Sequence, residues 1–319
     1  MNAGTAGAAG AVRAGAGPGI AMIVVAASCF AVMDTTISWI GAVVSIAVVL
    51  WLRYAIHAVV MACWLALAPG GGFRTRNLRF QVLRGGLLLF SSAMAFTALR
   101  QLPVAEFTAT IMLTPLLVTL LAALWLKERV SPARWVLVVL GFGGALVMIR
   151  PGSGLFGWIA LLPLAAALSN ASFQLLTSRY AALEDPYTTN FYTGVTGVAL
   201  ATPLLFLLHG DVSDTLQAAQ PLQLVVLLMI GLLGTAGHLL LIMAFGRAPA
   251  STLMPFQYTQ IGVAALAGAL FLGKRPDGWS WLGMGLIALA GAGSAWLTVR
   301  EAAARNQPIS ALAADTVAD

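Results

Sequence analysis

The chain has 319 residues, of which 60% are hydrophobic and only 9% are charged, with a formal net charge of +6. Soluble domains carry about 25% charged residues, so this composition excludes a soluble globular fold and indicates an integral membrane protein. The positive charge does not indicate nucleic-acid binding, because the basic residues stand singly in short loops between apolar segments.

Ten apolar segments of roughly the 20 residues that cross a bilayer follow one another, and they predict an all-α integral membrane fold with ten transmembrane helices. A Gly/Ala-rich stretch over residues 1–18 precedes them, and a polar Ala-rich tail over 300–319 follows; both are predicted to be disordered or unpacked. The predicted spans are 19–38, 42–68, 83–100, 103–126, 132–150, 155–178, 189–208, 221–245, 249–272 and 279–298.

The distribution of Lys and Arg predicts that both termini are cytoplasmic. With the N-terminus inside, twelve of the seventeen basic residues fall on the cytoplasmic side, four fall outside, and Arg53 lies within a span. Lys274 and Arg275 are two of the four on the outer side, contrary to the general bias. The cytoplasmic set is Arg13, Arg74, Arg76, Arg79, Arg84, Lys127, Arg129, Arg134, Arg179, Arg247, Arg300 and Arg305.

The stretch 103–150 recurs weakly, without a gap, 146 residues later at 249–296. The shared positions are Pro103/Pro249, Leu126/Leu272, Arg129/Arg275 and Trp135/Trp281. Five spans separate the two copies, and because five is odd the copies run in opposite directions through the membrane. The sequence therefore predicts two inverted-topology five-helix repeats, at 19–150 and 155–299, an arrangement that lets a central site open to each side in turn.

The segment LKERVSPARWVLVVLGFGGALVMIRPG, residues 126–152, resembles the end of the EamA module of the drug/metabolite transporter superfamily. The features of the resemblance are a Lys-Glu-Arg turn, a Trp and a Gly-rich last helix. It implies a two-module bundle around a central cavity and transport of amino acids, nucleobases, vitamins or related metabolites. The second copy has Lys274 where the family's turn Glu would stand, so Glu128 is interpreted as a turn and helix-end residue.

Ionisable groups in the hydrocarbon region are costly, at about 2.5–3.5 kcal/mol on insertion scales, so each one needs a reason to be there. They are Asp34, Arg53, His57, Glu106 and His238, and for the two histidines packing is the favoured interpretation. Helix geometry places Asp34 and Glu106 in the outer leaflet and Arg53 near the midplane. Arg53 forms either a structural pair with one of these carboxylates or a fork for a substrate carboxylate or phosphate. His57, one turn from Arg53, either shares the cavity or caps this polar face.

Glu106, Thr110 and Thr114 follow at i, i+4 and i+8 and form one polar stripe, which Pro115 interrupts. The stripe either lines a cavity or reflects a Glu106 in the headgroup region with threonines between helices. In the second half, polar residues cluster in the sixth and ninth spans, where Pro255 is expected to weaken the helix. They contact substrate or bond neighbouring helices; they are Asn170, Gln174, Gln257, Tyr258 and Gln260.

No nucleophile–base pair, zinc motif or phosphate-binding Gly loop stands at a credible position, so no cofactor, metal or catalytic residue is predicted. We expect a secondary carrier of a small polar or zwitterionic metabolite in a bacterial inner membrane. Its partners are the metabolite and the lipid bilayer, with protons as the candidate coupling ion through Glu106 or Asp34. A monomer suffices for the cavity, and a dimer is compatible. The alternatives are a membrane enzyme acting on a lipid-linked substrate and a non-transporting scaffold.

Overall fold

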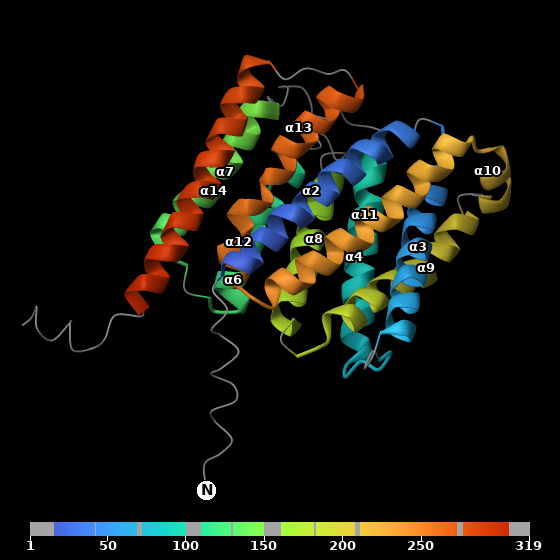
Figure 1. Ribbon diagram of the computed structural model, residues 1–319, viewed down its shortest axis with the longest axis horizontal. Helices are drawn as coiled ribbons and strands as arrows, with labels where there is room; N and C mark the ends of the chain where they lie inside the picture. The colour runs from blue at the N-terminus through green and yellow to red at the C-terminus, as the bar shows by residue number, and fades with distance from the viewer. Residues whose placement is uncertain are drawn as a thin grey trace, which may run out of the picture.

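The computed structural model describes residues 16–41, 43–68, 72–99, 110–128, 130–149, 161–181, 183–207, 211–272 and 277–305. These residues form helices, turns and connecting segments, and no strand occurs among them. The all-α prediction is confirmed (Figure 1). The helices are α2 (Gly17–Ile40), α3 (Ile46–Leu67), α4 (Leu78–Leu99), α6 (Thr114–Trp125), α7 (Pro132–Ile149), α8 (Leu161–Tyr180), α9 (Pro186–Leu207), α10 (Val212–Ala218), α11 (Pro221–Phe245), α12 (Ala250–Gln257), α13 (Thr259–Leu272) and α14 (Gly278–Arg305).

Five of the described helices, α2, α3, α4, α9 and α11, are long and apolar enough to cross a membrane. Shorter apolar helices cover Thr114–Trp125, Pro132–Val147 and Trp281–Ser294. Large apolar side chains face outward from several helices of the bundle; Leu67 of α3 is 83% exposed and Leu270 of α13 is 80% exposed. Outward apolar faces of this extent need an apolar surrounding, which a bilayer supplies.

Each predicted span contains helix in the structure, with three differences. The ninth span is interrupted: α12 ends at Gln257 and α13 begins at Thr259. The acidic loop after α9 contains the short helix α10, whose first turn is capped because Asp211 accepts a hydrogen bond from the backbone N–H of Asp214. Helix α14 continues to Arg305, so the first residues of the predicted tail are helical.

Proline and polar caps determine where several helices begin. Pro18, Pro115 and Pro221 stand in the first turns of α2, α6 and α11, where a missing N–H costs nothing. Asp185 accepts a hydrogen bond from the backbone N–H of Thr188 at the start of α9. Glu128 accepts hydrogen bonds from two backbone N–H groups at the start of α12. Its predicted role at a helix end is therefore confirmed, although the helix that it caps lies in the other half of the chain.

The largest helix contacts join the two halves of the chain. Helix α2 packs on α11, α3 on α9, α4 on α8 and α7 on α14 (Figure 1). Smaller contacts join α3 to α11, α4 to α9, α2 to α13, α6 to α8 and α6 to α12. The main hydrophobic core lies between α2, α3, α8 and α11, so polar residues on the inner faces of these helices are enclosed by apolar side chains.

Two glycines of α9 allow α3 to approach closely. A Cβ atom on Gly194 would lie 2.6 Å from the backbone nitrogen of Ala58, and one on Gly197 would overlap the ring of Tyr54. Real side chains do not tolerate such distances, so the spacing of α3 and α9 depends on these two positions. Gly143 of α7 is a natural comparison, because no atom lies within 4 Å of a Cβ built there.

We expect Gly194→Ala to lower the thermal unfolding midpoint of the detergent-purified protein, because the methyl group meets a backbone rather than a flexible side chain. Overpacking of this kind typically costs about 1–3 kcal/mol. Gly143→Ala adds the same methyl group to open space and should leave stability unchanged or raise it, since Ala is favoured over Gly in helices. Equal midpoints for the two variants would contradict the close α3/α9 contact.

Candidate functional site

A buried basic cluster lies between α3, α9 and α11 in the interior of the bundle. We define it as Arg53 and His57 of α3, Asn190 of α9 and His238 of α11; none of these side chains is more than 6% exposed. Arg53 and His57 stand one helical turn apart, so they share the inner face of α3. The apolar remainder of each helix faces lipid or core, which leaves the bundle interior as the place for these polar groups.

The hydrogen bonds of the cluster fix where each imidazole carries its proton. Asn190 Nδ2 donates to the carbonyl oxygen of Thr235 (3.1 Å), so its Oδ1 accepts from Nε2 of His57 (3.0 Å). Arg53 Nη2 donates to Nε2 of His238 (3.1 Å). Neutral His57 therefore presents Nδ1 as an acceptor, whereas neutral His238 carries a proton on Nδ1 and presents a donor.

Three nitrogens of the cluster are buried without a hydrogen-bond partner among the described residues: Arg53 Nε, His57 Nδ1 and His238 Nδ1. Buried polar groups are nearly always paired, so each exception needs an explanation. Two of these atoms are donors and the third is an acceptor. Together they form a ready hydrogen-bonding set for a polar ligand.

Aromatic rings frame the cluster. The ring of Phe30 from α2 lies 4.8 Å from that of His238 between centroids, and Phe173 of α8 meets the same imidazole edge-on at 5.7 Å. The two imidazoles are stacked at 6.1 Å. A flat ring with polar edges fits such surroundings, because aromatic faces pack on it while the nitrogens bond its rim.

A second guanidinium lies close by. Arg84 of α4 is completely buried and donates to Thr177 Oγ1, to the carbonyl oxygen of Thr189 and to Thr193 Oγ1. Its Cζ atom stands 5.2 Å from the centre of the Phe173 ring. The sequence interpretation counted Arg84 with the cytoplasmic residues that set orientation. The structure adds that its side chain is not in a loop but buried in the bundle, where hydroxyl and carbonyl groups of α8 and α9 accept its hydrogen bonds.

Of the two carboxylates considered as structural partners of Arg53, Asp34 forms no ion pair with it, and Glu106 lies outside the described residues. Arg53 bonds His238 instead, and the Asp34 carboxylate accepts a hydrogen bond from Nε2 of Gln260 at 2.9 Å. Asp34 is exposed, and Gln260 is half-buried. The structure thus brings two of the predicted site residues together, Asp34 of α2 and Gln260 of α13, whereas the sequence had suggested a contact between Asp34 and Arg53 of α3.

A crossing of two interrupted helices forms a second polar region. Helical residues 110–111 give way to a turn at 112–113 before α6, and Tyr258 separates α12 from α13. The Tyr258 hydroxyl donates to the carbonyl oxygen of Met112 (3.3 Å), a residue 146 positions earlier. Pro115 and Pro255 stand close to these breaks, as predicted, and each removes a backbone donor from its helix.

The remaining predicted residues divide between this crossing and helix α8. Thr114 Oγ1 and Gln257 Oε1 are buried without a partner among the described residues, while Thr110 is half-buried one turn before α6. In α8, Gln174 Nε2 donates to Asn170 Oδ1 (3.4 Å), and Gln174 Oε1 is buried and unpaired in the described part of the chain. Glu106 lies outside the described residues.

Sequence reasoning missed Arg84 and Asn190 and undervalued the two histidines. Asn190 belongs to a run of polar residues, Thr188, Thr189, Asn190 and Thr193, inside an otherwise apolar helix. That run is a usable signal, because a transmembrane helix buries such groups only where neighbours bond them. For His238 the sequence offers no partner within a helical turn, and only the packing of α11 on α3 supplies one.

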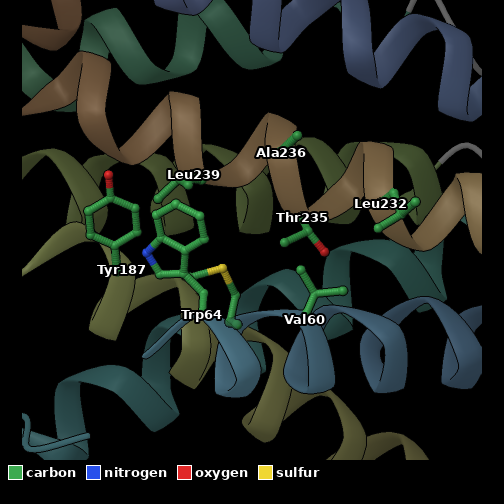
Figure 2. Close-up of a pocket in the computed structure, with 8 residues that line it drawn as sticks. Val60, Trp64, Tyr187, Leu232, Thr235, Ala236 and Leu239 are labelled. Carbon is green, nitrogen blue, oxygen red and sulfur yellow. The ribbon is translucent and has the colours of Figure 1, made fainter. Parts of the chain in front are cut away.

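An apolar groove opens on the outer side of the same helices. It lies between α3, α9 and α11 and has a volume of about 400 Å³ (Figure 2). Thr235, whose carbonyl oxygen accepts from Asn190, lies at this groove, so its floor is adjacent to the basic cluster. We call it the lateral groove; its walls are Val60, Met61, Trp64, Tyr187, Leu232, Thr235, Ala236 and Leu239.

Comparison with known proteins gives relatives of one kind. The riboflavin transporter of Vibrio cholerae is 30% identical over 257 residues, 80% of this chain and 84% of the relative. The riboflavin transporter of Rhizobium johnstonii is 34% identical over 194 residues, 60% of this chain and 62% of the relative. The S-adenosylmethionine uptake transporter of Rickettsia prowazekii is 24% identical over 229 residues, 72% and 76% of the two chains.

The fold and the family agree with these relatives. A solved crystal structure superposes with a TM-score of 0.71 over 92% of this chain and 98% of that chain, at 19% identity, so the fold is shared. The sequence model of the EamA-like transporter family matches residues 17–150 and 157–295, which confirms the resemblance found at residues 126–152. The chain therefore belongs to the EamA-like transporter family and is a multi-pass membrane protein that transports a small metabolite.

Proposed function

We propose that the chain carries a flat, polar heterocycle of the riboflavin type across a bacterial inner membrane, by alternating access and without ATP hydrolysis. The basic cluster is the binding site in this proposal. The observation that carries it is the set of three buried nitrogens that have no partner among the described residues, beside the aromatic rings of Phe30 and Phe173.

The chemistry of riboflavin matches this set. One edge of its ring system presents two carbonyl oxygens and an imide N–H. Arg53 Nε and His238 Nδ1 can donate to the oxygens, and His57 Nδ1 can accept from the imide. Each such bond removes the cost of a buried unpaired group, about 1–3 kcal/mol, so the ligand gains affinity from atoms that the empty site leaves unsatisfied. The riboflavin transporters of Vibrio cholerae and Rhizobium johnstonii support this substrate class.

A zwitterionic amino-acid derivative is the second candidate. Neither Arg53 nor Arg84 forms an ion pair with a carboxylate of the described residues, so either guanidinium can take a substrate carboxylate. The accessible Asp34 carboxylate offers a partner for a cationic group. The S-adenosylmethionine uptake transporters of Rickettsia favour this reading of the site.

Alternating access in this proposal rests on two inverted five-helix repeats with ten spans in all. The helix contacts support it, because the contacts made by helices of one repeat are matched by contacts of the equivalent helices in the other. The equivalent helices, in chain order, are α2, α3, α4, α6 and α7 in the first repeat and α8, α9, α11, α12–α13 and α14 in the second. The pair α2/α11 exchanges with α8/α4, α3/α11 with α9/α4, and α2/α13 with α8/α6. Tyr258 and Met112, which bond each other, are also repeat equivalents.

Proton coupling is part of the proposal for a driven carrier. Asp34, hydrogen-bonded to Gln260, is the described candidate for the proton-binding carboxylate, and Glu106 is the other. Thr114 and Gln257 offer buried oxygens that have no partner among the described residues, and a polar substrate or water can form hydrogen bonds with them as it passes the crossing. Thr110, Asn170, Gln174 and Tyr258 complete the proposed lining.

Riboflavin should raise the thermal unfolding midpoint of the detergent-purified protein. A ligand at 100 times its dissociation constant stabilises by about 2.7 kcal/mol, which corresponds to several degrees for a chain of this size. Arg53→Gln should weaken binding by about 10-fold or more, because a hydrogen bond from a charged group contributes roughly 1.5–3 kcal/mol. The check is a titration of the midpoint against riboflavin concentration.

Arg247→Gln is the matched control, since Arg247 is exposed and its guanidinium donates to the carbonyl oxygen of Met243 in the last turn of α11. It should leave the riboflavin shift intact. If S-adenosylmethionine raises the unfolding midpoint and riboflavin does not, the second candidate is the better substrate class for this site. An equal loss in both arginine variants would contradict the assignment of the cluster as the binding site.

The inverted repeat predicts that corresponding loops face opposite sides of the membrane. In a background with Cys63 and Cys29 replaced by Ala, Lys127→Cys should react with an impermeant maleimide only after the inner membrane is permeabilised, which gives the reagent access to the cytoplasmic side. Asp277→Cys should react in intact cells after the outer membrane is permeabilised. Both introduced thiols lie at exposed positions, so access depends on the side of the membrane. Labelling of both from the same side would rule out the inverted arrangement.

A further inference from the structure

The lateral groove continues along an aromatic strip to a basic loop. Trp64 stacks on Tyr187 at 5.6 Å between ring centroids, at one end of the groove (Figure 2). One turn further along α9, Phe191 meets Phe73 edge-on at 5.1 Å. Four aromatic rings therefore connect the groove to the loop before α4, and Trp64 is 53% exposed.

The first turns of α9 hold this loop in place. Thr188 Oγ1 donates to the carbonyl oxygen of Gly72 (2.7 Å), and the Tyr192 hydroxyl donates to that of Phe73 (2.9 Å). The two carboxylates nearby are already engaged: Glu184 accepts from Thr75 and from a backbone N–H, and Asp185 caps α9. The position of the loop beside the aromatic strip is thus defined by specific bonds.

Three arginines follow Phe73, and their guanidinium groups form no ion pair in the part of the chain that the structure describes. Arg74, Arg76 and Arg79 are exposed, and no hydrogen bond or ion pair joins their guanidinium groups to described residues. Guanidinium groups bind phosphate through paired N–H donors. The arginines, the aromatic pair Trp64 and Tyr187, and the apolar groove follow one another in space. This order matches the headgroup, glycerol region and acyl chain of a phospholipid.

We propose that the lateral groove is a specific site for an anionic phospholipid. One acyl chain lies along Leu232, Ala236 and Leu239, the glycerol region meets Trp64 and Tyr187, and the phosphate bonds Arg74 and its neighbours. The size of the groove favours a chain over a protein segment. A helix with its side chains is about 10–12 Å across and is too wide to be enclosed in a groove of about 400 Å³, whereas a single acyl chain is much thinner.

A lipid bound in this groove also affects the interior of the bundle. The groove lies between α3, α9 and α11, the same helices that carry the basic cluster, and it reaches Thr235, whose carbonyl oxygen holds Asn190. A bound chain therefore fills the space behind this hydrogen bond. The anionic lipid stabilises the packing of α11 against α3 and α9 in the state that the structure presents.

Native mass spectrometry of the full-length protein, released from detergent with added lipid, tests the proposal. Phosphatidylglycerol and phosphatidylcholine with identical acyl chains are titrated separately, and the fraction of protein with one bound lipid is measured. Phosphatidylglycerol should bind at least about fivefold more tightly, because each arginine at the surface contributes about 1 kcal/mol toward an anionic lipid. Arg74→Gln should reduce that preference by about the same factor, whereas Arg300→Gln, at an exposed arginine of α14, should not.

The groove itself is tested with a larger side chain. Ala236→Leu should fill the apolar wall and weaken phosphatidylglycerol binding severalfold, while Ala288→Leu, at an exposed position of α14, should leave it unchanged. Thermal unfolding of both variants without lipid verifies that each is folded. Equal affinity for the two lipids, equal binding by the two alanine variants, or equal binding of glycerophosphoglycerol without acyl chains would each overturn the proposal.

Discussion

A guanidinium group inside an apolar bundle loses its hydration, and its five N–H donors must then find acceptors in the protein. Arg84 and Arg53 meet this constraint differently. Arg84 is held by threonine hydroxyls and a carbonyl oxygen of α8 and α9. Arg53 has one acceptor, His238, and the Nε of each arginine is unpaired among the described residues. Arg53 therefore keeps more bonding capacity for a ligand than Arg84 does.

The close packing of the helices keeps the basic cluster compact. Gly234 of α11 faces the guanidinium of Arg53, where a Cβ atom would lie 3.2 Å from Nε, and Gly237 lies against the ring of Phe30. Gly194 and Gly197 play the same part for α9 against α3. Any larger residue would separate the helices or displace a polar side chain. Small residues thus determine the distances over which the cluster forms its hydrogen bonds, since close approach in membranes depends on them.

The sequence predicted the helical segments well, because hydropathy and span length depend only on local composition. It also located the weak points near Pro115 and Pro255, since a missing N–H is a local property. It failed on pairings. The partners of Arg53 and Asp34 depend on how far each helix is rotated about its axis, and no residue within a turn of either position reveals His238 or Gln260. Asn190 and Arg84 were missed for the same reason, because their acceptors lie on other helices.

Helix α2 connects the two polar regions of the molecule. Phe30 packs against His238 in the basic cluster, and one turn later Asp34 accepts the hydrogen bond of Gln260 beside the helix crossing. The helix is unbroken from Gly17 to Ile40, so these two contacts move together. Helix α13 is separated from α12 by the break at Tyr258, which is a natural place for a change of direction. A rigid tilt of α2 would therefore change its contact with Gln260 at the crossing and its contact with His238 in the basic cluster together. Helix α2 thus links the crossing to the aromatic wall of the proposed binding site.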